Sequence, residues 1–200
     1  MTTASPSVRP VRERLLRGLV QALAERRLNE VTMNDIARHA RTSKRTFYEH
    51  FDDKEACFLA LYRGICDGMA ARFAAILDET VPVEDQIAAI AGVYVGTLGA
   101  SPTLTRATLS DIIAGGDACL AARREQHERF AAGLREAFSA TRARQPGAGV
   151  REIDQETAAA LVGGINELLL RELDLGRADR LPELAGTVRA LFRAVVVERS

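Results

Sequence analysis

The chain has no tryptophan, only two lysines among its 200 residues, and three cysteines. Cys57, Cys66 and Cys119 are odd in number and show no CxxC spacing, which argues against a disulfide framework and against a paired-cysteine metal site. The N-terminal residues also lack the pattern of a secretory signal peptide. We therefore expect the protein to act in the reducing cytoplasm, with its cysteines buried as small apolar groups.

Long apolar runs are absent as well. The longest stretch without a charged residue covers residues 86–105, but Gly99, Ser101 and Pro102 interrupt its apolar part, so no membrane contact is predicted. No segment shows the alternation of apolar and polar residues that is typical of a strand. The histidines have no ligand spacing, and no nucleophile has a base beside it. We expect no metal, no cofactor and no enzymatic activity.

Charge is balanced overall but unevenly distributed. Residues 1–54 contain eleven lysines and arginines against seven aspartates and glutamates, a formal charge of +4, whereas residues 55–200 contain 16 against 20, a charge of −4. Both lysines, Lys44 and Lys54, lie in the positive segment. This distribution favours an anionic partner for the N-terminal end of the chain.

Hydrophobic periodicity predicts an all-α protein. Residues 1–8 are small and polar and are expected to form a disordered leader. Val11, Leu15, Leu19 and Leu23 then recur every four residues, as on the buried face of a first helix. Further helices are expected at about 33–40, 44–51, 54–77, 83–99, 103–113, 117–144, 152–173 and 181–197, about nine in all.

The second and third expected helices are short and close together. Thr32 with Asp35 fits a capping pattern at the start of one helix, and Ser43 is a candidate cap for the next. Only about three residues separate the two helices, a spacing typical of a helix-turn-helix, whose second helix reads base edges in the major groove.

The same segment resembles the DNA-binding signature of the TetR/AcrR transcriptional regulators. The resemblance rests on Thr32-xxx-Ile36-Ala37-xx-Ala40, followed by Ser43-xx-Thr46-Phe47-Tyr48-x-His50-Phe51-xx-Lys54-Glu55. It covers about residues 10–60. It implies a three-helix, helix-turn-helix DNA-binding domain in residues 9–54 and a ligand-sensing and dimerisation domain in residues 55–200.

Carried over by position, the resemblance assigns the DNA contacts. Thr32 would cap the first short helix near a phosphate, and Arg45 would read a guanine in the major groove. Lys54, at the start of the long helix, would bind a backbone phosphate, although a solvated lysine is an alternative, as is a Tyr48 ring that merely packs on the first helix. The implied contact residues are Thr32, Thr42, Ser43, Lys44, Arg45, Thr46, Tyr48, His50 and Lys54.

The turn departs from the family pattern. Arg41 and Thr42 stand where a glycine and a valine are usual, and Arg45 replaces a common small residue. Arg41 is therefore expected to adopt a left-handed backbone conformation without glycine's freedom, at a cost of about 1 kcal/mol. The departure affects the turn geometry and the DNA sequence preference rather than the fold.

The C-terminal part is compatible with a small-molecule pocket. Residues 87–100 are apolar on every side, as in a buried helix. Hydroxyl side chains nearby would supply the few polar groups of a mostly apolar pocket, or would bond to backbone in a filled core. The candidate pocket residues are Met69, Phe73, Tyr94, Thr97, Leu98, Thr105, Thr108 and Ile112.

Paired glycines, Gly163 and Gly164, interrupt the apolar segment 161–170 and would each weaken a helix by roughly 1 kcal/mol. Close approach of a partner helix would offset that cost, and the resemblance implies a four-helix dimer interface. Asn166 either fixes its register or faces solvent. The expected interface residues are Leu161, Gly164, Ile165, Leu168, Leu169, Leu184, Val188, Leu191, Phe192 and Val195.

The sequence thus predicts a homodimeric transcriptional regulator, a repressor that binds a palindromic double-stranded DNA operator and responds to a small, mostly apolar effector. An activator or a ligand-independent regulator is an alternative within the class. A helical small-molecule carrier or enzyme with a basic N-terminal module is the alternative outside it.

Overall fold

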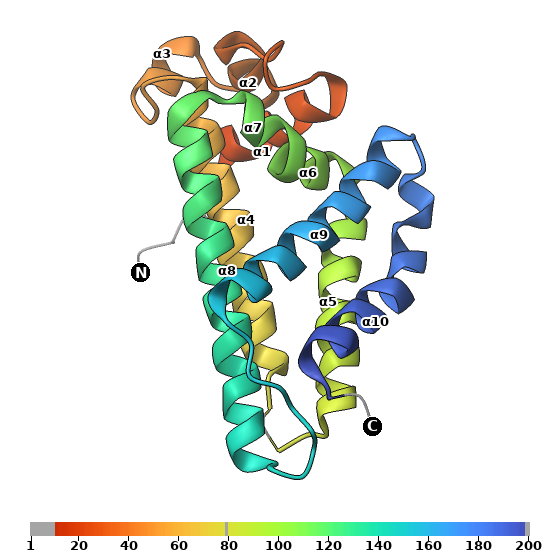
Figure 1. The fold of residues 1–200 in the computed structure, drawn as a ribbon. Coiled ribbons are helices and arrows are strands. Elements are labelled where there is room, and N and C mark those ends of the chain that lie inside the picture. The colour runs from red at the N-terminus through yellow and green to blue at the C-terminus, as the bar shows by residue number, and fades with distance from the viewer. Residues whose placement is uncertain (1–10, 79, 199–200) are drawn as a thin grey trace, which may run out of the picture.

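The computed structural model describes residues 11–78 and 80–198, so the expected disordered leader lies outside the described residues. Three helices gather at one end of the molecule (Figure 1): α1 (Val11–Glu25), α2 (Met33–His39) and α3 (Lys44–Tyr48). The long helix α4 (Lys54–Ile76) runs from them along the body. The described residues are almost entirely helical, with one isolated bridge between Val150 and Val197, which confirms the all-α fold class.

The body is built around two long neighbouring helices, α4 and α8, which run in the same direction (Figure 1). The remaining helices cover them from one side, with α9 crossing between α8 and the pair formed by α5 and α10. Their bounds are α5 (Val83–Gly99), α6 (Pro102–Arg106), the π-helical turn η1 (Ala107–Asp111), α7 (Ile112–Ala114), α8 (Gly116–Arg144), α9 (Gln155–Asp174), the 3₁₀ turn η2 (Ala178–Glu183) and α10 (Leu184–Val196).

Most of these helices lie within a few residues of their expected ranges because their start signals are local. The Thr32 hydroxyl accepts from the Asp35 N–H, and the Ser43 hydroxyl accepts from the Thr46 N–H. The Asp53 carboxylate accepts from the Ala56 N–H at 2.6 Å and starts α4. The helix expected at 103–113 is present as a continuous helical run, Pro102–Ala114, whose middle part, η1, is a π-helical turn.

Two apolar cores hold the fold together. The N-terminal core contains the predicted stripe of α1 with Ile36, Phe47 and Phe58, and it is closed by Ile112 and Cys119 from the body. All three cysteines are free and buried, as expected, and burial raises the pKa of the Cys57 thiol to about 12. The N-terminal helices are therefore packed directly against the body.

The second core lies between α5, α8, α9 and α10 and contains Ile87, Val95, Phe138 and Leu169 among its buried side chains. No single helix among the described residues is long and apolar enough to cross a membrane. Only α5 taken together with segment Pro102–Ala114 reaches that length and apolarity, and the two are bent by 98° at the break between them.

Candidate nucleic-acid interface and cavity

The first two helices approach each other unusually closely. Gly18 of α1 is buried, and a Cβ atom there would lie 2.5 Å from the Ile36 carbonyl oxygen and 2.9 Å from the Ala40 nitrogen. Glycine therefore allows α2 to lie directly on α1. This contact fixes the position of α2 relative to α1, and with it the position of the following turn and of α3.

The turn between α2 and α3 has a strained backbone and is stabilised by hydrogen bonds from a side chain of α1. Arg41 has φ 52°, which confirms the expected left-handed conformation at a position without glycine. The Arg14 guanidinium, on α1, donates to the carbonyl oxygens of Ala40 at 3.3 Å and Arg41 at 3.1 Å. Arg14 thus stabilises the end of α2 and the turn. Sequence reasoning missed this role because the contact spans 26 residues and has no local signal.

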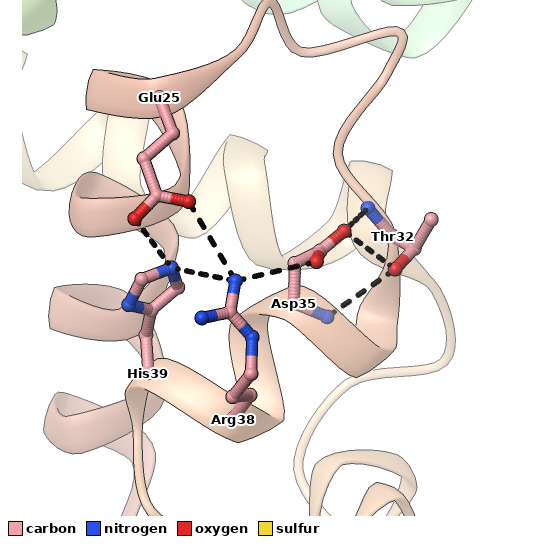
Figure 2. A network of polar contacts seen from close by, with 5 residues as sticks. All are labelled: Glu25, Thr32, Asp35, Arg38 and His39. Atoms are coloured by element: carbon pink, nitrogen blue, oxygen red, sulfur yellow. Dashed lines mark hydrogen bonds and ion pairs between the residues drawn. The ribbon is translucent and has the colours of Figure 1, made fainter.

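A polar network joins the end of α1 to α2 (Figure 2). Glu25 lies between His39, at 3.3 Å, and Arg38, at 3.6 Å, and Arg38 also contacts Asp35 at 3.5 Å. Asp35 and Thr32 complete a reciprocal cap, and the hydrogen bonds from the Thr32 hydroxyl and N–H lower the pKa of the Asp35 carboxyl. The cap predicted at Thr32 is confirmed, and its hydroxyl both donates to and accepts from Asp35 within it.

Helix α3 presents polar side chains outward over a buried aromatic base. Phe47 is completely buried, whereas Lys44, Arg45 and His50 are exposed. The Arg45 side chain is 90% exposed and has only a loose contact with Glu49, at 3.4 Å. The whole outward row can therefore approach another molecule without unpacking the domain.

The remaining residues of this row are held in place by short-range contacts. Tyr48 is 46% exposed, and its ring packs edge-on against Phe47 and has the Lys44 ammonium 5.8 Å from its centre. The Ser43 and Thr46 hydroxyls are 2.9 Å apart. Thr42, which is partly buried, reaches the Ala37 carbonyl oxygen at 3.5 Å. The structure thus brings the predicted contact residues 42–50 together on one surface.

Lys54 is the exception and corrects the sequence-based expectation. Its ammonium donates to the carbonyl oxygens of Leu28 at 2.9 Å, Asn29 at 3.1 Å and Val31 at 3.1 Å. An ammonium has three N–H donors, and all three are used. Lys54 therefore ties the α1–α2 loop to the start of α4 and is not a free cation for a phosphate.

A cavity of about 360 Å³ opens in the body between α4, α5, α8 and α9. Phe73, Ile90, Leu134 and Val162 line it together with small alanines, and Phe192 closes it from α10. Of its polar lining atoms, the Thr141 hydroxyl donates to Gln86 Oε1 at 2.9 Å, and the Gln86 amide donates to the Val81 carbonyl oxygen. The walls offer apolar surface with few unpaired polar groups.

The predicted pocket residues are only partly gathered there. Phe73 and Tyr94 line this cavity, and Met69, Leu98, Thr108 and again Tyr94 line a smaller adjoining cavity of about 50 Å³. Thr97, Thr105 and Ile112 line neither, which corrects their assignment. Ile112 belongs to the N-terminal core.

Two of the predicted pocket hydroxyls are bound to nearby backbone, the alternative left open above. The Thr105 hydroxyl donates to the Leu98 carbonyl oxygen at 2.6 Å, and the Thr108 hydroxyl donates to the Leu104 carbonyl oxygen at 2.9 Å. These bonds satisfy carbonyls around the break between α5 and the π-helical turn.

The predicted dimer residues also need correction. Five of them lie in the protomer's own core and cannot meet a partner without unpacking it: Leu161, Ile165, Leu169, Val188 and Phe192. Leu184, Leu191 and Val195 pack at the edge of that core, and Leu168 is partly buried. Gly164 is exposed, with no atom within 4 Å of the position of an added Cβ. The five core residues are therefore removed from the predicted interface, whereas Gly164 and the partly exposed Leu168, Leu184, Leu191 and Val195 stay predictions.

A direct contact joins the N-terminal helices to the π-helical turn of the body. The Arg27 guanidinium is 3.1 Å from Asp111, whose side chain is buried, and Arg106 donates to the Leu23 carbonyl oxygen at 2.8 Å. Asp111 Oδ2 and Arg106 Nε are buried without partners. Thr108 and Leu109 of the same turn line the smaller cavity, so one segment contacts both regions.

The geometry is that of a helix-turn-helix domain packed on a cavity-bearing helical body. A sequence model described as "Bacterial regulatory proteins, tetR family" matches residues 15–61, the segment that folds into α1 to the first third of α4. Residues 15–61 thus match the DNA-binding domain of the tetR family, which confirms the resemblance found in the sequence. Regulators of this family are not enzymes.

Solved structures with the same fold cover nearly the whole chain. The fatty acid degradation regulator FadR from Bacillus halodurans is 18% identical, with a TM-score of 0.80 over 93% of this chain and 96% of that one. FadR from Bacillus subtilis, solved in complex with stearoyl-CoA, is 17% identical, with a TM-score of 0.78 over 90% and 96%. Salmonella enterica GusR is 22% identical, with a TM-score of 0.73 over 96% and 97%. None of the curated protein sequences compared with the chain matches it.

Proposed function

We propose that this protein is a transcriptional regulator of the TetR family, a cytoplasmic, ligand-responsive repressor that binds a palindromic operator as a homodimer. The DNA-binding part of the proposal rests on α3, which exposes its cationic side chains while Phe47, on its inner side, is completely buried. A rigid helix with outward Lys, Arg, Thr and Tyr side chains has the donors that a major groove and its phosphates require.

Within this surface the residues take different roles. Arg45, extended and nearly free, reads a guanine edge through its planar guanidinium. Lys44, Tyr48 and His50 bind the phosphate backbone and set the register. Ser43, Thr42 and Thr46 lie at the start of the helix, where short side chains let the backbone approach the groove.

Effector binding in the body would shift the protein between two arrangements of the DNA-binding domains. The large cavity is mostly apolar, so its ligand is expected to be mostly apolar. A fold relative was solved with stearoyl-CoA, which has a long apolar chain and supports this expectation. The contact of Arg27 with Asp111, beside a turn that lines the smaller cavity, and the continuous helix α4 connect that region to the N-terminal helices.

The dimer would form through the exposed faces of α9 and α10. Ala160 and Gly164 on α9, and Ala190 and Ala194 on α10, lie one helical turn apart and are exposed in the protomer. Small residues allow two helices to approach closely, and this close approach would offset the cost of a glycine at position 164 inside a helix. A two-fold dimer would place two α3 helices for successive major grooves.

Specific DNA binding is the first property to test. Fluorescence anisotropy with DNA from upstream of the protein's own gene should show a preference over scrambled DNA, with affinity that falls steeply as salt rises. Arg45→Ala should reduce specific affinity about tenfold and scrambled-DNA affinity much less. Arg124→Ala, an exposed arginine on α8, is the matched control and should change neither.

The result also separates the alternatives. Equal loss on all DNA sequences would contradict base reading by Arg45. Absence of any salt-dependent DNA binding would favour the rival in which the helical body is a small-molecule carrier. Expression measured with and without the protein would distinguish a repressor from an activator.

The oligomeric state is tested by enlarging the proposed seam. Gly164→Leu should convert a dimer to a monomer in sedimentation velocity, because a side chain would occupy the space into which the partner helix packs. Gly64→Leu, an exposed helical glycine on α4 with equal free space, is the control and should remain dimeric. A dimer that persists in Gly164→Leu would place the interface elsewhere.

A further inference from the structure

Tyr94 lies where the large apolar cavity meets the smaller one. Its side chain lines both, and Phe130 is the other lining residue that they share. The Tyr94 ring stacks on Phe73, with ring centres 5.9 Å apart, and this contact holds the hydroxyl at the junction. The polar side of the small cavity is formed by Tyr62, Cys66, Gln126, His127 and Asn166.

A directed chain of hydrogen bonds fixes which way the Tyr94 hydroxyl points. The Tyr94 O–H donates to Asn166 Oδ1, and Asn166 Nδ2 lies 3.2 Å from His127 Nε2. An amide nitrogen can only donate, so Nε2 accepts and the ring proton is on Nδ1. Burial, with a smaller contribution from Arg123, lowers the pKa of His127 and keeps its imidazole neutral, as the chain requires.

This chain leaves the Tyr94 oxygen with lone pairs but no proton to offer. The oxygen is therefore an acceptor facing the junction of the two cavities. The other interior polar groups of the large cavity, Thr141 and Gln86, are already bonded to each other and to backbone. A ligand in the apolar cavity thus meets Tyr94 as its available polar contact among the described interior residues.

The walls also disfavour an anionic group. Arg129 is the cationic residue among the described residues that line the large cavity, and its guanidinium is bonded to Asp67 at 3.2 Å and to Gln126 at 3.1 Å. Glu136, also on the lining, is negative. A carboxylate would face the lone pairs of Tyr94 without a free cation to balance it.

We propose that the effector is an uncharged, mostly apolar molecule carrying one hydroxyl or N–H group, which donates a hydrogen bond to the Tyr94 hydroxyl oxygen. The proposal rests on the proposed function, in which this cavity is the effector site. Its apolar part fills the large cavity, and its donor group reaches the junction beside the small one. Tyr94, through the bond to Asn166, sets the specificity for a donor.

Three probes of equal chain length test the proposal: 1-decanol, decyl methyl ether and decanoate. A flexible alkyl chain adapts to an apolar cavity, and only the alcohol can donate a hydrogen bond at pH 8. Titration calorimetry with the full-length protein should show 1-decanol binding on the order of fivefold more tightly than the ether, the ratio expected for one hydrogen bond, with decanoate weaker still.

Two variants test whether the preference for the alcohol over the ether depends on the Tyr94 hydroxyl. Tyr94→Phe should reduce the advantage of the alcohol over the ether to less than about twofold, because the acceptor is gone while the ring remains. Tyr62→Phe, which removes a hydroxyl from the same small cavity but not from the bonded chain, is the matched control and should keep the advantage. If Tyr94→Phe does not fold, the comparison of the three probes with the wild-type protein still decides.

The outcomes separate this inference from the proposed function. Equal binding of alcohol and ether, tightest binding of decanoate, or an alcohol preference that survives in Tyr94→Phe would overturn it while leaving an effector cavity. Binding of none of the three probes would overturn it and count against the cavity as an effector site. The anisotropy measurement without probe tests the DNA-binding role independently.

Discussion

Gly18→Ala is expected to lower the free energy of unfolding by about 2 kcal/mol and to reduce operator affinity more than tenfold. Helix propensity alone predicts the opposite, because alanine in a helix interior is about 1 kcal/mol more favourable than glycine. The space around Gly18 decides whether the substitution raises or lowers the free energy of unfolding. The new Cβ would lie 2.5 Å from the Ile36 carbonyl oxygen, and backbone cannot rotate away as a flexible side chain can.

The clash is expected to cost about 3 kcal/mol, which exceeds the propensity gain. Relief requires α2 to move off α1, and α2 carries the turn and α3 with it. Urea unfolding followed by circular dichroism gives the stability, and anisotropy gives the DNA affinity. Loss of affinity should exceed what the unfolded fraction explains, because the surviving folded molecules have a displaced α3.

Gly68→Ala is the matched control for this prediction. Gly68 lies inside α4, is exposed, and has no atom within 4 Å of an added Cβ. The same substitution there should stabilise the protein by up to about 1 kcal/mol and leave DNA binding unchanged. A Gly18→Ala protein as stable as this control would show that α1 and α2 are not in backbone contact.

Local signals made much of the DNA-binding domain predictable. Thr32, Ser43 and Asp53 start their helices through contacts within three residues. The left-handed conformation of Arg41 was expected because the family resemblance places a glycine at that position. Burial of Phe47 beneath an outward polar row follows from helical periodicity. Such features need only the neighbouring sequence, so no knowledge of the tertiary fold was required.

Long-range features were not predictable in the same way. The apolar faces of α9 and α10 suggest an interface, but Leu161 and Val188 show that those faces build the protomer's own core. Periodicity reports that a face is buried, not what buries it. Asn166, expected either at a dimer seam or in solvent, instead bonds to Tyr94, 72 residues away.

Lys54 shows the same limit in a single side chain. A lysine at a helix start suggests a phosphate contact, because its charge and the helix N-terminus act together. The folded chain places three carbonyl oxygens of the α1–α2 loop around the ammonium instead. A lysine suits this position because its three N–H groups diverge, whereas the planar fork of an arginine cannot meet three such acceptors equally.

Lys54→Met is therefore expected to lower the free energy of unfolding by about 2 kcal/mol while leaving the salt dependence of DNA binding unchanged. Methionine keeps an unbranched stem of similar length but removes all three donors. Each lost bond to a charged group is worth more than a neutral one, and partial exposure of the side chain reduces the total because water replaces some of the bonds.

The chain's other lysine provides the matched comparison. Lys44 is exposed on α3, and its ammonium contacts only the Tyr48 ring among the described residues. Lys44→Met should leave stability within about 0.5 kcal/mol and reduce the slope of log affinity against log salt by about 1, as loss of one phosphate contact requires. Urea unfolding and a salt series of anisotropy titrations give both quantities for both variants. If Lys54→Met reduced the salt slope and left stability unchanged, the lysine would bind phosphate in the complex, and its bonds to the three carbonyl oxygens would contribute nothing to folding.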